Sequence, residues 1–332
     1  MRAIVQERYG SPERLRLAEV DDPVPSAQEV LVRVRAASVN AYDWHVMRGD
    51  PYIARLMAPG VFGPRGPRRR IRGRDLAGVV EAVGDAVTTL KVGDAVFGDA
   101  GLLDGAFAEL ARVPQDRLAR IPAELGFEEA AAAPLAGTTA YRALAELAAV
   151  RPGQRVLVNG ASGGVGTFAV QIAIALGAEV TAVCSTRNAE LVATLGAHHV
   201  VDYRREDFTQ TAERYDTVLD LVGNRALDEL AGVAADDGIL LLSGGGTSNG
   251  PTVFGPMRRL IAAQLRARSL PQRVVVMTGD PPVSVSLAGL AGLIDRGAVR
   301  PIIDRTYPLE QVPDAIRYVE TEHARAKVVV TV

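Results

Sequence analysis

Apolar and polar residues alternate along several short stretches in the first third of the chain. The stretch 29–39 places Val30, Val32, Val34 and Ala36 at every second position, which is the period of a half-buried β-strand. Further short strands are expected at Arg2–Glu7, Leu15–Val20, Leu76–Val83, Ala95–Phe97 and Ala106–Val113. Glycine-containing turns separate these runs, and short strands spaced in this way predict a small β-rich unit over residues 1–123.

The pattern changes after residue 123. Residues 127–149 are rich in alanine and leucine and predict a helix, and strands then alternate with helical segments. The strands are expected at Val156–Asn159, Glu179–Cys184, His199–Asp202, Thr217–Leu221 and Ile239–Leu242. Such alternation predicts right-handed crossovers and a doubly wound parallel sheet, so the fold class is α/β with a second, β-rich domain.

The last third contains a predicted helix at Met257–Arg268 and a strand at Arg273–Met277. The tail returns to strand pattern at Pro301–Tyr307 and Ala326–Val332, around a helix at Glu310–Glu320. We expect these tail elements to pack on the N-terminal unit. The expected domains are therefore residues 1–123 with 281–332, and residues 124–280.

A glycine-rich turn joins the first strand of the parallel sheet to its helix. It reads G-x-x-G-x-x-G over residues 160–166, with Ser162, Gly163, Gly164, Val165 and Gly166 leading into the helix. Glycines let the backbone approach a pyrophosphate closely, and the helix N-terminus presents free N–H groups to it. Because a strand, a helix and a parallel strand surround the motif, it predicts a dinucleotide site.

The end of the next strand indicates which dinucleotide binds. A site for NAD would carry an acid there, whereas this chain reads Cys184-Ser185-Thr186-Arg187. An acid repels a 2′-phosphate, while hydroxyls and a guanidinium hold it. The sequence therefore predicts NADP(H).

Composition narrows the remaining possibilities. The formal net charge is −2 over 332 residues, which argues against a nucleic-acid binder. Cys184 is the only cysteine, so a disulfide within the chain and a multi-cysteine zinc site are both excluded, and a cytoplasmic setting is expected. We expect no signal peptide and no membrane span, because no apolar run reaches the required length.

Several motifs occur in a fixed order along the chain. They are Asn40-Ala41-Tyr42-Asp43-Trp44, Gly73-Arg74-Asp75-Leu76-Ala77-Gly78, Val92–Gly98, Gly105–Glu109, the glycine turn, and Lys327-Val328-Val329-Val330. Together they resemble the zinc-independent quinone oxidoreductase (zeta-crystallin-like) branch of the medium-chain dehydrogenase/reductase superfamily. The resemblance implies a GroES-like catalytic domain and a Rossmann domain, with the active site in the cleft between them.

The zinc-dependent members of this superfamily place a cysteine after the first long strand and a Gly-His-Glu segment further on. Here those regions read Ser38-Val39-Asn40 and Gly73-Arg74-Asp75, and a replacement site from Asp43, His45 and Asp75 is the alternative. Without a metal to polarise an alkoxide, alcohol oxidation loses its electrophile. We expect a reductase of acceptors that are already activated.

The resemblance and the strand ends together give the expected cofactor-binding residues. Ser185, Arg187 and Tyr203 are expected at the 2′-phosphate, although Arg187 also fits a solvated helix start and Tyr203 also fits edge packing. The other expected contacts are Thr138, Val222, Ser243, Gly244, Gly245 and Lys327. For these, a helix-start hydroxyl, a glycine-rich loop and an ordinary strand start remain the alternatives.

Three residues are the expected catalytic candidates. By resemblance, Asn40 lies beside the nicotinamide ribose. His45 stands where the branch often has tyrosine, and an imidazole there can donate a hydrogen bond or proton as hydride arrives; a structural histidine is the equal alternative. Tyr52 lies one residue beyond the tyrosine acid of related enoyl reductases, so its role stays open.

The function expected from these features is NADPH-dependent hydride transfer to a quinone or another conjugated carbonyl, without zinc. The alternatives are an enone or enoyl carbon–carbon double-bond reductase and a non-catalytic NADPH-binding structural or regulatory protein. The expected partner is a small molecule rather than a nucleic acid or a membrane. We also expect a homodimer, formed through the apolar edge strand 273–277.

Overall fold

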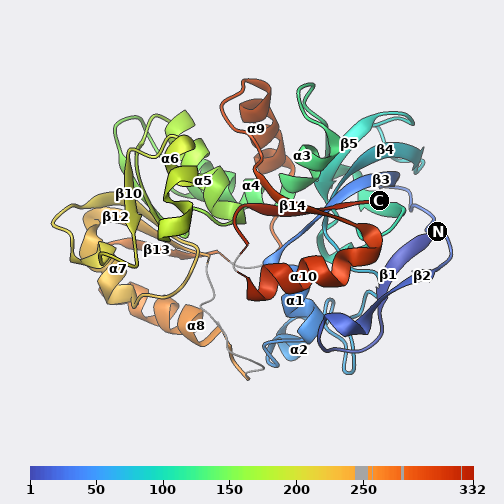
Figure 1. The fold of residues 1–332 in the computed structure, drawn as a ribbon, viewed down its shortest axis with the longest axis horizontal. Coiled ribbons are helices and arrows are strands. Elements are labelled where there is room, and N and C mark those ends of the chain that lie inside the picture. The colour runs from blue at the N-terminus through green and yellow to red at the C-terminus, as the bar shows by residue number, and fades with distance from the viewer. Residues whose placement is uncertain (244–252, 256, 278–279, 323) are drawn as a thin grey trace. The chain divides into compact units, whose positions relative to one another are not determined.

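The structure is a computed structural model that describes residues 1–243, 253–255, 257–277, 280–322 and 324–332. The chain forms two compact units (Figure 1). They are Met1–Thr138 with Asp280–Gly297 and Pro301–Val332, and Thr139–Gly279 with Ala298–Arg300. The first unit thus extends to Thr138, and the domain limits expected above stay a prediction.

The first unit is built on β-strands. Its strands are β1 (Arg2–Gln6), β2 (Leu15–Glu19), β3 (Glu29–Val39), β4 (Asp75–Val83), β5 (Ala95–Asp99), β6 (Leu110–Pro114), β7 (Leu118–Arg120), β14 (Ile303–Pro308) and β15 (Lys327–Thr331). Among the described residues, one sheet has the order β14-β15-β3-β4-β5-β7 with β6 also paired to β3, and β1 pairs with β2. The expected period on β3 is confirmed, because Val30, Val32, Val34 and Ala36 are buried while Arg33 and Arg35 are exposed.

The tail of the chain joins this unit, as expected. Strand β15 pairs antiparallel with β3, with Val328 opposite Val39. The helices of the unit are α1 (Ala41–Arg48), α2 (Ala54–Met57), α3 (Phe127–Ala132), α9 (Ser284–Asp295) and α10 (Val312–Thr321). Helix α10 contributes Val312, Ala315 and Ile316 to the apolar core beneath the sheet.

The second unit contains a six-stranded parallel sheet of order β10-β9-β8-β11-β12-β13 in the part of the chain that is described. The strands are β8 (Arg155–Asn159), β9 (Glu179–Cys184), β10 (His199–Asp202), β11 (Tyr215–Asp220), β12 (Ala234–Leu242) and β13 (Arg273–Val276). Val156, Leu157 and Val158 are all fully buried, as expected of a strand covered on both faces. The order corresponds to a doubly wound dinucleotide-binding sheet, which confirms the expected fold class.

The helices of the second unit are α5 (Gly164–Ala175), α6 (Ala189–Thr194), α7 (Leu227–Val233) and α8 (Met257–Arg266), while α4 (Pro134–Tyr141) spans the boundary between the units. The single helix expected over 127–149 is divided into α3, α4 and a π-helical turn, Arg142–Leu147. Pro134 lacks the N–H that would continue the hydrogen-bond ladder of α3. Helices α1 and α9 were not expected.

Candidate functional site

The glycine turn after β8 requires its glycines for steric reasons. Gly160 has a φ of 90°, and the N–H groups of Gly160 and Ala161 donate to the Val183 carbonyl at 3.1 and 3.0 Å. A Cβ on Gly166 would lie 2.2 Å from the Gly160 carbonyl oxygen and 2.7 Å from the Ala161 backbone. A Cβ on Gly163 would meet only the Gly160 oxygen, at 3.4 Å. The turn therefore leaves open space at Gly163 and none at Gly166.

Helix α5 begins at this turn. Its first backbone bond runs from the Thr167 N–H to the Gly163 carbonyl, at 3.0 Å, so the N–H groups of Gly164, Val165 and Gly166 have no acceptor within the helix. Ser162 lies just before, and its Oγ accepts a hydrogen bond from Asn188 Nδ2 at 2.9 Å. A helix N-terminus behind an open glycine turn fits the pyrophosphate of a dinucleotide.

The residues expected at the 2′-phosphate follow neighbouring strands. Because Cys184 on β9 is opposite Asp202 on β10, Ser185 and Tyr203 begin at the same edge of the sheet, and the Tyr203 N–H donates to the Cys184 carbonyl at 3.1 Å. Ser185 is buried, whereas Arg187 and Tyr203 are exposed. Ser185 and Tyr203 thus follow neighbouring strand ends, Arg187 comes two residues after Ser185, and the contact of all three with cofactor stays a prediction.

The sequence reasoning did not consider one carboxylate at this edge. Asp202 Oδ2 accepts from Thr186 Oγ1 at 2.6 Å, and its Oδ1 accepts from the Arg204 N–H at 3.0 Å. These hydrogen bonds, the one from Thr186 first, lower the pKa of Asp202. The signal that could have found it is the strand register, because Asp202 ends the strand beside β9.

Asp220, the last residue of β11, organises the next turn along the edge. Its Oδ1 accepts from Asn159 Nδ2 at 2.8 Å and from the N–H groups of Val222 and Gly223 at 3.2 and 3.0 Å. Its Oδ2 accepts from Arg259 Nη2 on α8 at 2.6 Å. Asp220 is fully buried, so it fixes the backbone that carries the expected contact Val222.

The expected contacts after β12 are only partly described. The Ser243 N–H donates to the Asp220 carbonyl at 3.0 Å, which places Ser243 beside the Asp220 turn. Gly244 and Gly245 lie outside the described residues.

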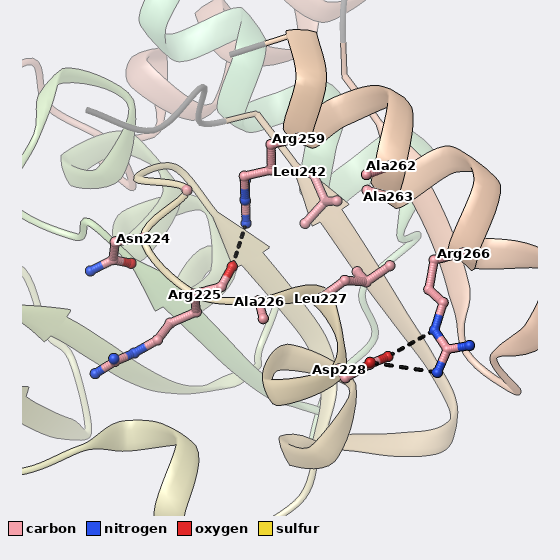
Figure 2. Close-up of a pocket in the computed structure, with 11 residues that line it drawn as sticks. Asn224, Arg225, Ala226, Leu227, Asp228, Leu242, Arg259, Ala262, Ala263 and Arg266 are labelled. Carbon is pink, nitrogen blue, oxygen red and sulfur yellow. Dashed lines mark hydrogen bonds and ion pairs between the residues drawn. The ribbon is translucent and has the colours of Figure 1, made fainter. Parts of the chain in front are cut away.

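A pocket of about 600 Å³ lies between α8 and the start of α7 (Figure 2). Leu227, Leu242 and Ala263 form apolar parts of its wall. Its arginines are engaged, because Arg259 also donates to the Arg225 carbonyl at 3.1 Å and Arg266 is ion-paired with Asp228 on α7 at 3.2 Å (Figure 2). The pocket adjoins the Val222 turn through Gly223.

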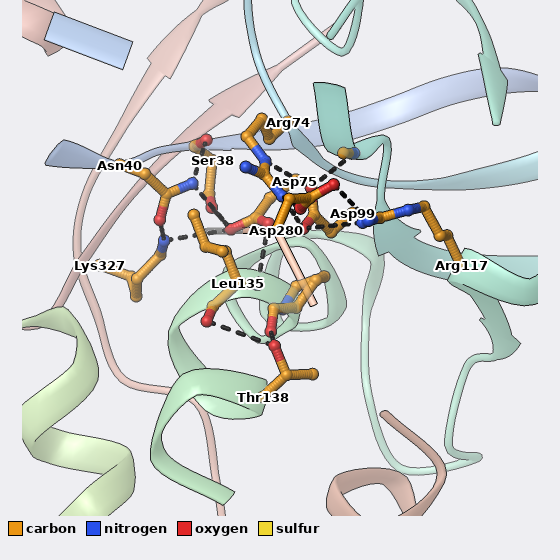
Figure 3. Close-up of polar contacts among 12 residues, drawn as sticks. Ser38, Asn40, Arg74, Asp75, Asp99, Arg117, Leu135, Thr138, Asp280 and Lys327 are labelled. Carbon is orange, nitrogen blue, oxygen red and sulfur yellow. Dashed lines mark hydrogen bonds and ion pairs between the residues drawn. The ribbon is translucent and has the colours of Figure 1, made fainter. Parts of the chain in front are cut away.

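A buried polar cluster lies in the first unit, where β3 ends and β4 and β15 begin (Figure 3). Lys327 Nζ donates to Asn40 Oδ1 at 2.6 Å, and Asn40 Nδ2 donates to Asp75 Oδ2 at 2.9 Å. Ser38 Oγ donates to the same Asp75 oxygen at 2.9 Å, and the Leu135 N–H donates to Asp75 Oδ1 at 2.9 Å. The structure thus brings together two expected site residues, Asn40 and Lys327, around Asp75, which the sequence suggested only as a ligand of the alternative metal site.

Charge in this cluster is balanced internally. Burial raises the pKa of Asp75, and the Lys327 ammonium opposes that rise. Lys327 is 2% exposed and also approaches the Val39 carbonyl and Asp75, at 3.4 and 3.3 Å. Its ammonium is therefore directed at Asn40 and its neighbours, and the expected cofactor contact of Lys327 stays a prediction.

Thr138 lies one helical turn after Leu135 on α4 (Figure 3). Its Oγ1 donates to the Pro134 carbonyl at 2.7 Å, and the side chain is buried. The hydroxyl oxygen still has acceptor capacity, because only its proton is used in this bond. A role at the cofactor stays a prediction.

The other two catalytic candidates lie on and after α1. His45 stacks on Trp44 with ring centroids 3.7 Å apart. Burial lowers the pKa of His45 against the opposing effect of Asp50, and His45 Nδ1 has no hydrogen-bond partner among the described residues. Tyr52 is 43% exposed, with the Arg55 guanidinium 4.6 Å from its ring centroid. A neutral imidazole suits hydrogen bonding better than acid catalysis.

A second buried cluster lies beside α1. Asn40 begins the helix, and Asp43 Oδ2 accepts from the Asn40 N–H at 2.8 Å. Burial raises the pKa of Asp43 to about 7, although the Arg72 guanidinium opposes that change. Arg72 is itself buried and ion-paired with Asp104 at 2.5 Å. Sequence reasoning missed this pair, since nothing local marks Arg72 among the neighbouring arginines.

No group of three His, Cys, Asp or Glu side chains in the described residues is arranged to hold a metal ion. No helix in the described part of the chain is long and apolar enough to cross a bilayer.

Comparisons with known proteins agree with this architecture. An alcohol dehydrogenase GroES-like domain model matches residues 26–123, and a zinc-binding dehydrogenase model matches residues 195–330. The quinone oxidoreductase of Homo sapiens is 32% identical over 95% of this chain and 92% of its own length. Polyketide synthase GfsB of Streptomyces halstedii is 35% identical over 92% of this chain and 5% of its own length.

A solved structure extends the similarity to the fold. The quinone oxidoreductase from Coxiella burnetii has a TM-score of 0.83 and 27% identity, covering 100% of this chain and 99% of that one. The family expected from the motifs is therefore confirmed by sequence and by fold. The chain belongs to the quinone oxidoreductase branch of the medium-chain dehydrogenase/reductase superfamily.

Proposed function

We propose that this protein is an NADPH-dependent oxidoreductase that reduces quinones or other conjugated carbonyl compounds without zinc. The observation that carries the proposal is the glycine turn after β8, which leaves space at Gly163 and leads into the first turn of α5, where three N–H groups have no acceptor within the helix. Membership of the quinone oxidoreductase family supports the same activity. When bound, NADPH supplies the hydride, and the protein supplies binding and orientation.

NADPH is preferred over NADH in this proposal. Ser185, Arg187 and Tyr203 would hold the 2′-phosphate, because hydroxyls and a guanidinium are the donors that a phosphate binds. Asp202 stays ionised at this edge, because hydrogen bonds from Thr186 and the Arg204 N–H lower its pKa, so in this proposal the three donors outweigh its charge at the phosphate. The pyrophosphate would lie at Gly163 and the first turn of α5.

Reduction of a conjugated carbonyl places negative charge on its oxygen. We assign stabilisation of that oxygen to the Asn40 amide, with His45 as a second, neutral hydrogen-bond donor. Donors that are fixed before the reaction stabilise developing charge without reorganisation. The Asn40 amide is already oriented by Lys327 and Asp75, which suits it to this role.

The acceptor class is tested by following NADPH absorbance with quinones, enones, aldehydes and enoyl thioesters. We expect consumption with quinones or enones and none with simple aldehydes. Consumption with aldehydes alone would contradict the proposal, and saturable NADPH binding with no consumption would favour a non-catalytic binding protein.

A carbon–carbon double-bond reductase is the second candidate. The similarity to a segment of a polyketide synthase favours it. Product analysis separates the two activities, since alkene reduction leaves a saturated ketone or thioester, whereas quinone reduction leaves a quinol.

We further propose a homodimer in the cytoplasm. Strand β13 pairs only with β12 among the described strands and carries the apolar run Val274–Val276, so its outer edge can pair with a second copy across a two-fold axis. A buried single cysteine is compatible with a reducing compartment. Light scattering tests the dimer by its mass.

A further inference from the structure

We propose that Asp75 is a positioning residue for the reaction, because its buried carboxylate orients the Asn40 amide and the Lys327 ammonium and ties both to the start of α4. The inference rests on the proposed function, in which Asn40 faces the reacting oxygen. It adds a residue that acts through Asn40 rather than by contact with cofactor or acceptor.

The position of Asp75 follows from strand register. Asp75 begins β4 directly opposite Ser38 on β3. Val39 on β3 is opposite Val328 on β15 in an antiparallel pair. Asn40, which follows Val39, therefore meets Lys327, which precedes Val328. One carboxylate therefore stands where three strands come together (Figure 3), and its side chain is buried.

The surroundings of Asp75 consist of hydrogen-bond donors. Its Oδ2 accepts from Ser38 Oγ and Asn40 Nδ2, both at 2.9 Å, and lies 3.3 Å from Lys327 Nζ. Its Oδ1 accepts from the Leu135 N–H at 2.9 Å. Three of these donors meet Oδ2 and one meets Oδ1, and groups that only donate suit an ionised carboxylate, which only accepts.

The charges on both sides of Asn40 define which way its amide points. Lys327 Nζ lies 2.6 Å from Asn40 Oδ1, and Asp75 Oδ2 lies 2.9 Å from Asn40 Nδ2. A flipped amide would direct its NH2 group at the ammonium and its oxygen at the carboxylate, and both contacts are repulsive. The second proton on Nδ2 is directed toward the Ser38 carbonyl, 3.5 Å away, and this contact is long enough for a closer oxygen to replace it.

Asp75 also connects Asn40 to α4. The Leu135 N–H is in the first turn of α4, and the same helix carries Thr138 one turn later. A carboxylate at a helix N-terminus is favoured by the helix dipole. Asp75 thus fixes Asn40 and Lys327 relative to the helix that carries the expected cofactor contact Thr138.

The kinetic test compares D75N with N40A and the double variant, using the best acceptor from the panel. We expect D75N to lower kcat about tenfold to a hundredfold, as misplacement of a reacting group does, with KM for NADPH changed less than about threefold. In the N40A background, D75N should lower kcat less than about threefold, because the group through which it acts is gone.

A second readout does not depend on turnover. The chain has only two lysines, Lys91 and Lys327, and Lys91 is exposed. Amine acylation with detection by mass spectrometry therefore reports Lys327 against an internal reference. Asp75 Oδ2 is one of the contacts that hold the buried Lys327 ammonium in place, so D75N should release this amine for reaction and raise the Lys327-to-Lys91 ratio about tenfold.

D99N is the matched control. Asp99 is opposite Asp75 across β4 and β5 and is also buried, and besides burial its negative charge helps to raise the pKa of Asp75. Its ion pairs are with Arg74 and Arg117, so D99N changes the charge beside Asp75 but removes no hydrogen bond to Asn40 or Lys327. D99N should lower the unfolding temperature while leaving the acylation ratio within about twofold of wild type.

The outcomes separate the two proposals. A wild-type enzyme that oxidises no NADPH with any acceptor overturns the proposed function and this inference with it. If the wild type is active but D75N lowers kcat by the same factor in the wild-type and N40A backgrounds, only this inference is overturned. Equal acylation ratios in D75N and D99N also overturn it, because they would reflect general loosening.

Discussion

The glycine turn allows a prediction in which two substitutions of the same kind have opposite consequences. Gly166→Ala places a Cβ 2.2 Å from the Gly160 carbonyl oxygen and 2.7 Å from the Ala161 backbone, far inside the ~3.5 Å at which carbon contacts become attractive. Gly163→Ala meets only the Gly160 oxygen, at 3.4 Å, and its φ of −80° suits alanine. The first change therefore strains the fold and the second does not.

The magnitudes follow from the neighbours. Both atoms near Gly166 are backbone of the same tight turn, so overpacking should cost about 3 kcal/mol, offset by about 1 kcal/mol of helix propensity. The net loss of about 2 kcal/mol corresponds to a fall of roughly 4–8 °C in unfolding temperature for a unit of this size. Gly163→Ala should cost no more than about 1 kcal/mol, the effect of a weaker N-cap.

NADPH binding should be affected in the opposite order, with the specific loss in Gly163→Ala. In Gly163→Ala the new methyl group occupies the open side of the turn, where the pyrophosphate is proposed to lie, so the Kd for NADPH should rise at least about tenfold, since a displaced charge-assisted hydrogen bond is worth about 1.5–3 kcal/mol. Thermal unfolding by circular dichroism and titration of NADPH fluorescence measure the two effects. A Gly163→Ala protein that binds NADPH like wild type would refute the assignment of this turn, and a fully stable Gly166→Ala protein would refute its geometry.

Three further predictions address the cofactor, the buried acid and the dimer. Arg187→Glu should raise KM for NADPH at least about tenfold and KM for NADH less than about threefold; equal effects on both cofactors would remove Arg187 from the phosphate site. Because burial raises the pKa of Asp43 to about 7 from an ordinary value of 3.8, the folded protein holds a proton that the unfolded chain releases, and stability should fall as pH rises from about 4 to about 7. The Asp43→Asn protein should lose that dependence, so its free energy of unfolding relative to wild type should increase by on the order of a few kcal/mol from pH 5 to pH 8. Urea unfolding at pH 5 and pH 8 measures this difference, and a variant whose stability changes with pH in parallel with wild type would contradict it. The Met277 N–H donates to the Leu242 carbonyl on β12, so the alternate N–H of Val276 points to the open edge, and Val276→Pro should convert the dimer to a monomer in light scattering; an unchanged mass would place the interface elsewhere.

The parallel sheet and its phosphate turn could be predicted from the sequence because their signals are local. Strand β8 is an uninterrupted apolar run, and its turn carries glycines whose spacing has a steric cause at Gly160 and Gly166. The strand pattern of the tail also predicted β15 itself, which pairs with β3.

The acids that organise the site could not be predicted in this way. Asp75 lies 252 residues from Lys327 and 60 residues from Leu135, and Asp220 is joined to Arg259 from 39 residues away. Asp75 belongs to a motif that carries the family resemblance, but nothing in the neighbouring sequence indicates the partners of either acid. Strand register sets the partners of Asp75, and helix α8 brings Arg259 to Asp220. Helix α1 had a local signal, the capping pair Asn40 and Asp43. Asn40 was interpreted as a catalytic candidate and Asp43 as a possible metal ligand, so the helix start was not predicted.

The most direct test of the account is the fate of NADPH in the presence of a conjugated acceptor. Purified protein is mixed with NADPH and a quinone or an enone, NADPH absorbance is followed, and the product is identified by mass spectrometry. The account predicts that NADPH is consumed in equal amount with the reduced acceptor, and faster than NADH at equal concentration. Saturable NADPH binding without consumption of any acceptor would contradict it.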